Sequence, residues 1–110
     1  MAIRANLRVD QGADYVTTIN VTDDDSNNAI NLIGYQGSAQ LRKYYTSATS
    51  YSFTVTINGA LGEVALGLSA NTTNAITPGR YVYDCEVVDT VGKRSRLIEG
   101  IVTITPQVTR

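Results

Sequence analysis

Apolar and polar residues alternate along most of this chain, and this pattern limits the possible fold more than any other sequence feature. A period of two is typical of a β-strand with one buried face. The alternation runs through residues 3–9, 15–21, 35–41, 51–57 and 81–87, and further apolar runs occupy 64–68 and 97–104. No stretch of about 10 to 12 residues has the three- and four-residue apolar spacing of a helix. The sequence therefore predicts an all-β chain.

Antiparallel sheets follow from the missing helices, because parallel neighbours need a long crossover connection. A length of 110 residues suits one domain, which buries roughly two thirds of the surface of its unfolded chain. We expect a single domain over residues 1–110, an antiparallel two-sheet immunoglobulin-like β-sandwich of about seven to eight strands. At most one short helical turn is expected near residues 69–76, with Ser69 as its cap.

Turn residues separate the predicted strands. Asn58 and Gly59 follow a strictly alternating run, and an Asn-Gly pair predicts a two-residue type I′ hairpin turn because both of its residues need a positive φ. Pro78 and Gly79 are expected to end the helical turn and begin the next strand. Residues 89–93 predict the last hairpin, so the basic run 93–96 is expected at a solvated hairpin tip.

A tyrosine two residues before a cysteine is the spacing of an immunoglobulin tyrosine corner, and Tyr83 and Cys85 have it. Cys85 is the single cysteine, so an internal disulfide is excluded and Cys85 is expected to fill core volume. A tyrosine hydroxyl at this corner is expected to bond a backbone carbonyl of the preceding connection. Tyr83 is the first candidate for that bond, and Tyr81 is the competing one.

Charge and composition exclude several functions. The chain has 9 Lys and Arg residues and 10 Asp and Glu residues, so no strong field favours nucleic acid or anionic membranes. It has no histidine, and the carboxylates Glu63, Glu86 and Glu99 fall in different predicted strands. Neither an enzyme nor a cofactor is predicted. No apolar segment suggests export or anchoring, which fits synthesis in a reducing cytosol.

A calcium loop is one interpretation of Asp23, Asp25 and Asn27, whose oxygens alternate as in such loops. Asn28 and Gly34 stand where that motif requires Gly and Glu. A solvated turn over residues 23–28 is the preferred interpretation, and no metal site is predicted.

Tyrosines gather around one predicted loop. Lys43, Tyr44, Tyr45 and Tyr51 surround a polar break at residues 46–50. Tyrosine offers a large rigid contact area with a polar tip, so this loop is the candidate binding site for a protein or a sugar. The alternative is that Tyr44 or Tyr45 forms a cross-strand pair with Tyr51 on the flanking strands.

Several segments resemble the N-terminal Ig-like domain of phage baseplate upper proteins and related small phage virion proteins. The likeness extends over about residues 4–110, and it is carried by the segments 11–15, 31–35, 38–42, 64–73, 78–84, Gly92 and 97–104. In longer members of that family this domain attaches the protein to the virion. The resemblance implies a phage structural protein that attaches to or decorates the particle.

The expected function is therefore non-enzymatic. The resemblance implies a virion component of the tail, baseplate or neck, or a capsid decoration, that contacts other virion proteins and copies of itself. Strand addition at an open sheet edge is one expected means of contact. The alternative is a soluble adhesion module that recognises a host surface glycan through the tyrosine loop.

Overall fold

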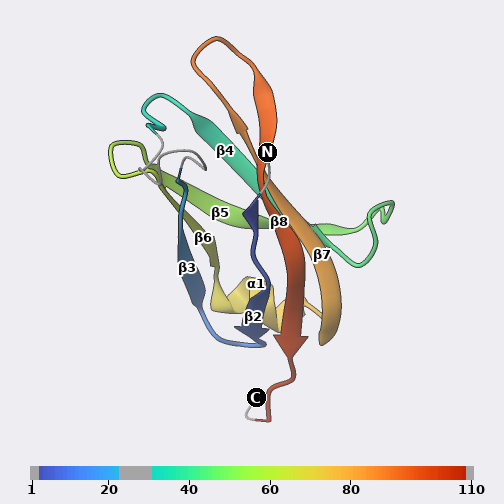
Figure 1. The fold of residues 1–110 in the computed structure, drawn as a ribbon. Coiled ribbons are helices and arrows are strands. Elements are labelled where there is room, and N and C mark those ends of the chain that lie inside the picture. Colours follow the sequence, from blue (N-terminus) through green and yellow to red (C-terminus); the bar gives the residue numbers. More distant parts are fainter. Residues whose placement is uncertain (1–2, 23–30, 109–110) are drawn as a thin grey trace.

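The computed structural model describes residues 3–22 and 31–108. Its described part consists of strands and one short helix, so the expected mostly-β composition is confirmed (Figure 1). The elements in chain order are β1 Ile3–Arg4, β2 Leu7–Asp10, β3 Tyr15–Asn20, β4 Gln36–Arg42, β5 Ser50–Asn58, β6 Glu63–Leu68, α1 Ala70–Ala75, β7 Gly79–Val88 and β8 Arg94–Thr105.

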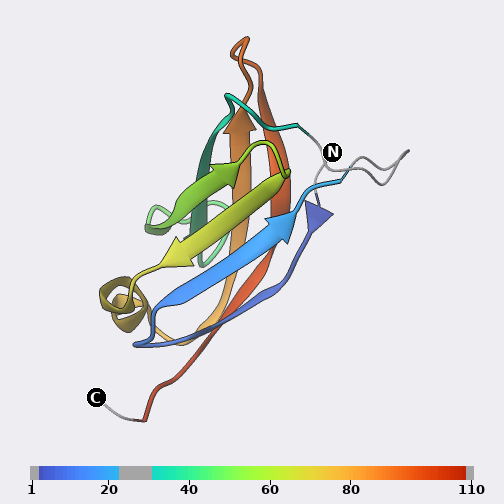
Figure 2. The ribbon, with the colours of Figure 1, turned by 90° about the vertical axis from the view of Figure 1, so that its left-hand side faces the viewer.

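The strands form one continuous sheet that curls into a half-barrel (Figures 1 and 2). The strand order is β1-β8-β7-β4-β5-β6-β3, and β2 also pairs with β8. The sheet turns at β5, because Ser50–Phe53 pairs with β4 whereas Thr54–Asn58 pairs with β6. Gly37 on β4 lies against the departing part of β5, where an added Cβ would come within 2.8 Å of Val55 Cγ1.

The sheet is mixed, because β1 and β2 both run parallel to β8. The predicted antiparallel two-sheet arrangement therefore does not describe this edge or the continuous turn at β5. Parallel pairing needs a long connection between the two strands. Here the paired strands come from the two ends of the chain, so most of the domain is that connection and no crossover helix is required.

The core lies inside the curl and is built from the inward face of each alternating strand. Phe53 is 6% exposed and Tyr83 is 4% exposed, while Ile19 and Val55 are half-buried at its margin. The rings of Phe53 and Tyr83 pack 5.7 Å apart at an interplanar angle of 59°. The fully buried aliphatic side chains are Val9, Val21, Leu32, Leu41, Val64, Leu66, Ile76, Val87, Ile98, Val102 and Ile104.

α1 closes one end of the curl, and it lies where the sequence predicts a helical turn. The Ser69 side chain caps it by accepting the Thr72 N–H at 3.3 Å. Thr73 is buried without leaving its hydroxyl unpaired, since that oxygen accepts the Gly12 N–H at 3.0 Å and donates to the Ala13 carbonyl at 2.9 Å. The helix is thereby tied to the β2–β3 connection.

The hairpin after β5 exists, but its predicted turn type is wrong. Asn58 pairs with Glu63, so four residues, 59–62, form the connection in place of two. The positive φ of 64° belongs to Gly62. Gly59 is needed for space, because an added Cβ there would lie 2.5 Å from the Ile33 backbone nitrogen. Asn-Gly marks a close approach of two loops at this position.

The two corner tyrosines bond different carbonyls. Tyr81, the competing candidate, makes the corner bond expected first of Tyr83, because the Tyr81 hydroxyl donates to the Thr77 carbonyl at 2.6 Å. Tyr83 instead donates to the Ala5 carbonyl at 2.5 Å, which ties the N-terminal segment to β7. Pro78 is half-buried beside this corner, and Gly79 begins β7 with a φ of 145°.

Cys85 is fully buried in the middle of β7, as predicted for a volume-filling residue. Burial is the main reason that the pKa of its thiol rises to about 11, with the charges of Asp84 and Glu86 adding to the effect. The thiol is therefore protonated at neutral pH and is not poised as a nucleophile.

Candidate functional site

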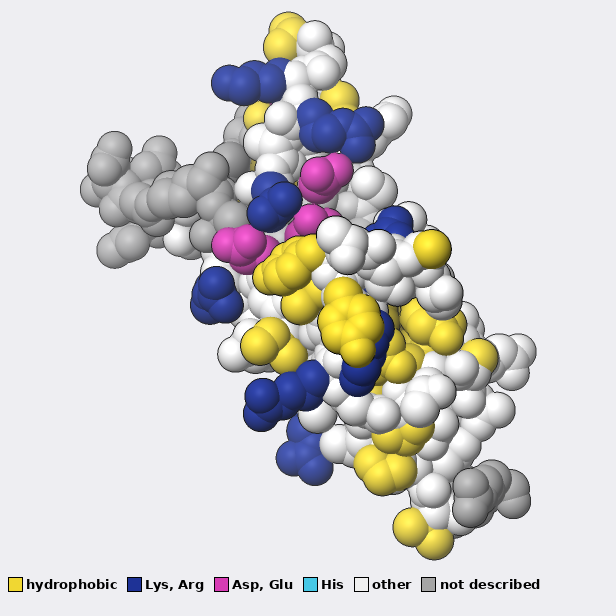
Figure 3. All heavy atoms as spheres, turned by 90° about the vertical axis from the view of Figure 1, so that its right-hand side faces the viewer, with side chains coloured by type: hydrophobic (Ala, Val, Ile, Leu, Met, Phe, Trp, Pro, Cys, Tyr) yellow, Lys and Arg dark blue, Asp and Glu magenta, His cyan; other side chains and the backbone are white. Residues whose placement is uncertain are grey.

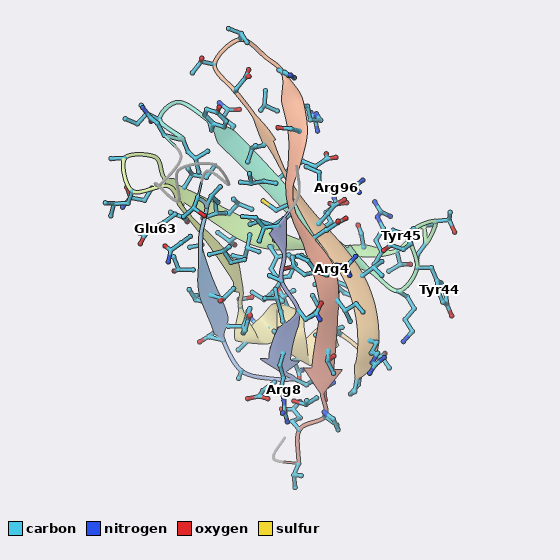
Figure 4. The ribbon with its side chains drawn as sticks, viewed as in Figure 1. Arg4, Arg8, Tyr44, Tyr45, Glu63 and Arg96 are labelled. Atoms are coloured by element: carbon cyan, nitrogen blue, oxygen red, sulfur yellow. The ribbon has the colours of Figure 1, made fainter. Side chains whose placement is uncertain are left out.

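The loop between β4 and β5 presents two adjacent tyrosines to solvent. Tyr44 is 67% exposed and Tyr45 is 83% exposed. Figure 4 shows both side chains projecting from this loop on the side of the molecule away from Glu63. We call residues 43–49 the tyrosine loop.

The tyrosine loop is held in shape by hydrogen bonds within it and to the end of β4. The Ser47 N–H donates to the Tyr44 carbonyl at 3.1 Å, and the Ser47 hydroxyl accepts the Thr49 N–H at 3.3 Å. The Arg42 guanidinium donates to the Ser47 carbonyl at 2.5 Å and to the Gln40 side chain at 3.0 Å. A loop ordered in advance loses little conformational entropy when a partner binds to its tyrosines.

Lys43 and Tyr51 are tied to the sheet, unlike Tyr44 and Tyr45: Lys43 is exposed but bonded to β7, and Tyr51 is half-buried. The Lys43 ammonium donates to the Arg80 carbonyl at 3.1 Å and lies 5.0 Å from the centre of the Tyr81 ring. Tyr51 is half-buried against the core and pairs across the sheet with Leu41. The expected grouping is thus divided, since Tyr44 and Tyr45 face outward, and Tyr51 forms no cross-strand pair with either.

A cluster of ion pairs lies on the outer face of β7 and β8. Arg96 approaches the Asp84 carboxylate and the Glu99 carboxylate at 3.4 Å each, and Arg94 approaches Glu86 at 3.3 Å. Figure 3 shows the face that carries the tyrosine loop, with hydrophobic side chains gathered near its middle and Lys, Arg and acidic side chains around them. The basic run 93–96 is exposed, as expected, but both of its arginines are paired with acids.

Asp84 and Glu99 stand directly opposite each other on β7 and β8, with Arg96 between their charges. Burial raises the pKa of Asp84 above its ordinary 3.8, and Glu86 and Glu99 add to the rise, which Arg96 only partly offsets. Because the folded-state pKa exceeds the unfolded one, the folded chain binds this proton more tightly. The free energy of unfolding therefore falls as the pH rises through the range just above 3.8.

Arg96→Ala is expected to enlarge that loss. Without the cation, the pKa of Asp84 rises further, and two like charges face each other at neutral pH. We expect the variant to be up to about 1 kcal/mol less stable than the wild type at pH 7 and equal to it at pH 3, which lies below the raised pKa of Asp84. Urea denaturation at both pH values measures this, with Arg94→Ala, which leaves Asp84 and Glu99 bridged, as control. A deficit of the same size at both pH values would contradict it.

A shallow depression runs along the outer face of β6. It is an open groove of about 350 Å³ between Val16 on β3 and Thr54 on β5. The groove stays unfilled because Ala65 has only a methyl group and Gly67 has no side chain. Asp14 at its end is its one charged lining residue. The groove thus offers shape and apolar surface, with no converging acid and base.

No metal-binding cluster is found within the described residues. Residues 3–22 and 31–108 contain no group of three or more His, Cys, Asp or Glu side chains that could hold a metal ion. The calcium interpretation of 23–28 lies outside the described residues. Of the carboxylates considered above, Glu86 and Glu99 share the face of β7 and β8, while Glu63 lies on β6. The described part also contains no helix that is long and apolar enough to cross a membrane.

The ion-pair cluster is the feature that sequence reasoning missed. Its signal would have been the register of the hairpin that joins β7 and β8, which brings residue 84 opposite residue 99. That register shifts between Cys85 and Glu86, so counting outward from the turn at 89–93 places the pairs one residue out of step.

Comparison with known proteins supports the fold alone. No protein-family model and no curated protein sequence matches the chain. Among solved structures it is similar to an internalin-like protein of Listeria monocytogenes, lmo2027, with a TM-score of 0.54 and 14% sequence identity. The match covers 94% of this chain and 28% of the Listeria protein, so the chain spans little more than a quarter of that structure's length.

Proposed function

We propose that this chain is a non-enzymatic structural protein of a phage virion, which attaches to or decorates the particle through protein-protein contacts. The observation that carries the proposal is the tyrosine loop, where Tyr44 and Tyr45 are exposed on a backbone already fixed by Ser47 and Arg42. Rigid aromatic anchors of this kind are enriched at protein interfaces. The resemblance to Ig-like domains of phage baseplate proteins is the reason for proposing that these contacts are made in a phage particle.

We also propose that the half-barrel is a variant of the immunoglobulin-like sandwich. The series β3-β6-β5 and β4-β7-β8 follow the order of the two sheets in that architecture, and parallel pairing of the first strand with the last adds to the likeness. In this view β5 belongs to both sheets, with its first part beside β4 and its second part beside β6. Tyr81 then serves as the tyrosine corner.

The proposed partners are other virion proteins and further copies of this chain, and the proposed location is the virion after synthesis in the host cytoplasm. Balanced charge argues against nucleic acid and membrane surfaces, because acids and bases are interleaved on the same face of β7 and β8. Recognition of a host glycan by Tyr44 and Tyr45 is the competing function. It predicts that the free protein binds host cells or sugar arrays.

Mass spectrometry of separated heads and tails, with immunogold labelling of intact particles, tests the virion assignment. We expect the chain in particles, at a repeated position on the head or the tail. Its absence from purified particles would overturn the proposal. Sugar-array binding by the free protein, without binding to particles that lack the chain, would favour the glycan alternative.

The double substitution Tyr44→Ala and Tyr45→Ala tests which surface makes the contact. Each truncation of an interface anchor costs about 2 kcal/mol, so we expect the affinity for particles that lack the chain to fall by about 100-fold or more. Stability should change little, because both side chains are exposed. Val91→Ala, at the 86%-exposed tip of the β7–β8 hairpin, is the matched control and should bind as the wild type does. Equal binding by the double variant would exclude the tyrosine loop.

A further inference from the structure

Strand β3 ends one side of the sheet without the usual protection of an edge strand. Its six residues, Tyr15–Asn20, include no charge and no proline, and its pairing with β6 continues without a register shift. The opposite end of the sheet differs, because β1 and β2 are short, are separated at residues 5–6, and carry Arg4, Arg8 and Asp10. Short strands and charges are the means by which proteins prevent edge-to-edge pairing.

The free side of β3 presents a regular row of backbone groups. The Val21 N–H donates to the Gly62 carbonyl at 2.8 Å, which fixes the phase of the ladder between β3 and β6. Since alternate residues of an antiparallel strand point their N–H and C=O to the same neighbour, those of Val16, Thr18 and Asn20 point away from β6. No strand among the described residues pairs with β3 on this side. The side chains of these three residues are exposed on the outer face, with Val16 at 73%.

The absence of charged side chains on β3 favours an uncharged strand as its pairing partner. The Lys and Arg residues within the described ranges all lie outside β3, β5 and β6, on the half of the sheet around β7 and β8 or in its loops. An identical strand would therefore bring no charged side chain to the contact, and pairs of β-branched residues would face each other. Pairing of identical strands about a two-fold axis is also the simplest closed assembly of one chain.

We propose that β3 pairs antiparallel with β3 of a second copy, about a two-fold axis at Thr18. In this register Thr18 faces Thr18 of the second copy and Val16 faces Asn20, so all six open backbone groups are used. The inward faces of both copies also stay on the same side of the joined sheet. This inference rests on the proposed function, in which copies of the chain contact one another in the virion. It adds the edge and the register of that contact.

Thr18→Pro tests the pairing. Proline removes the Thr18 N–H, which points away from β6, so it should disturb the fold less than it disturbs the edge. Two of the six intermolecular hydrogen bonds are lost, and we expect the dimer dissociation constant to rise by at least about tenfold. Sedimentation equilibrium of the whole chain over a concentration series measures it. Unchanged self-association of a folded Thr18→Pro variant would overturn the proposal.

A charge exchange at the same residue keeps the test decisive if the proline variant fails to fold. Thr18→Lys and Thr18→Glu should each dimerise more weakly than the wild type, because like charges then face each other, and an equimolar mixture should recover the loss. Thr56→Lys is the matched control. Thr56 lies in the same row of the sheet, two strands from the edge, and is also exposed.

Two results separate this inference from the proposed function. A wild-type chain that remains monomeric at about 1 mM, or a mixture that recovers nothing, overturns self-pairing. If that monomer still binds particles through the tyrosine loop, the virion assignment stands without the dimer. If Thr18 variants lose the dimer while the chain is absent from particles, self-pairing stands and the virion assignment fails.

Discussion

Phe53→Ala is expected to lower the free energy of unfolding by about 3–5 kcal/mol. Phe53 is buried at the residue where β5 leaves β4, and it lies opposite the small residue Ala39 and against the ring of Tyr83. Few neighbouring side chains can move to fill the space, because both partners of β5 are fixed by their own strands. Domains of this size are stable by about 5–15 kcal/mol, so a large part of the total would be lost.

Urea and thermal denaturation followed by circular dichroism measure this loss, with a fall in Tm of about 12 °C or more. Tyr45→Ala removes an aromatic ring of similar size from the surface and should change stability by no more than about 0.5 kcal/mol. Phe53→Leu should restore much of the stability, since it refills most of the volume. A cost below about 1 kcal/mol for Phe53→Ala would show that the turn of the sheet does not depend on this ring.

The alternating pattern predicted which side chains face the core, because each strand turns every second residue toward it. It could not reveal the partner of each strand. β5 keeps its alternation through Phe53 and Thr54, although its neighbour changes there from β4 to β6. A change of partner leaves the inward face inward, so the period of two continues and the turn of the sheet is invisible in the sequence.

The break between β1 and β2 in the N-terminal segment is also invisible in the alternating pattern. Ile3, Ala5, Leu7 and Val9 alternate without interruption, yet the structure divides them into β1 and β2. The interruption is caused by contacts with β7 and β8, which lie more than 70 residues away in the chain. The Asn58-Gly59 signal failed similarly, because a contact with Ile33, rather than the turn, requires the glycine.

The candidate site was predictable where it depended on local chemistry. Tyr44 and Tyr45 are adjacent beside a polar break, so an alternating strand could not bury both side chains. Both are exposed in the structure. Tyr51 was grouped with these two, but it belongs to the alternating run of β5 and lies half-buried. The open edge of β3 was not predictable, because an edge is defined by the strand order, which only the assembled sheet shows.

Gly100→Ala is expected to detach the N-terminal segment from β8 and to lower the free energy of unfolding by about 2–4 kcal/mol. A Cβ on Gly100 would overlap the Ala5 carbonyl oxygen and lie 2.8 Å from the carbonyl carbon. Ala5 is held there by two hydrogen bonds, one to the Glu99 carbonyl at 2.9 Å and one from the Tyr83 hydroxyl at 2.5 Å. Displacement breaks both and leaves the Tyr83 hydroxyl without its partner, and each such loss costs about 1 kcal/mol or more.

Limited trypsin digestion reports the detachment directly, because Arg4 and Arg8 lie in the two strands that would be released. Cleavage there should become faster, while Gly67→Ala, whose added Cβ meets no atom closer than 3.4 Å, should be cut at the wild-type rate.

A double-mutant cycle with Tyr83→Phe then assigns the cause. Gly100→Ala and Tyr83→Phe break the same bond to Ala5, so together they should cost about 1 kcal/mol less than the sum of their separate costs. Additive costs would mean that the segment stays on Tyr83 and that β8 bends to admit the methyl group. That outcome would leave the path of the N-terminal segment independent of Gly100.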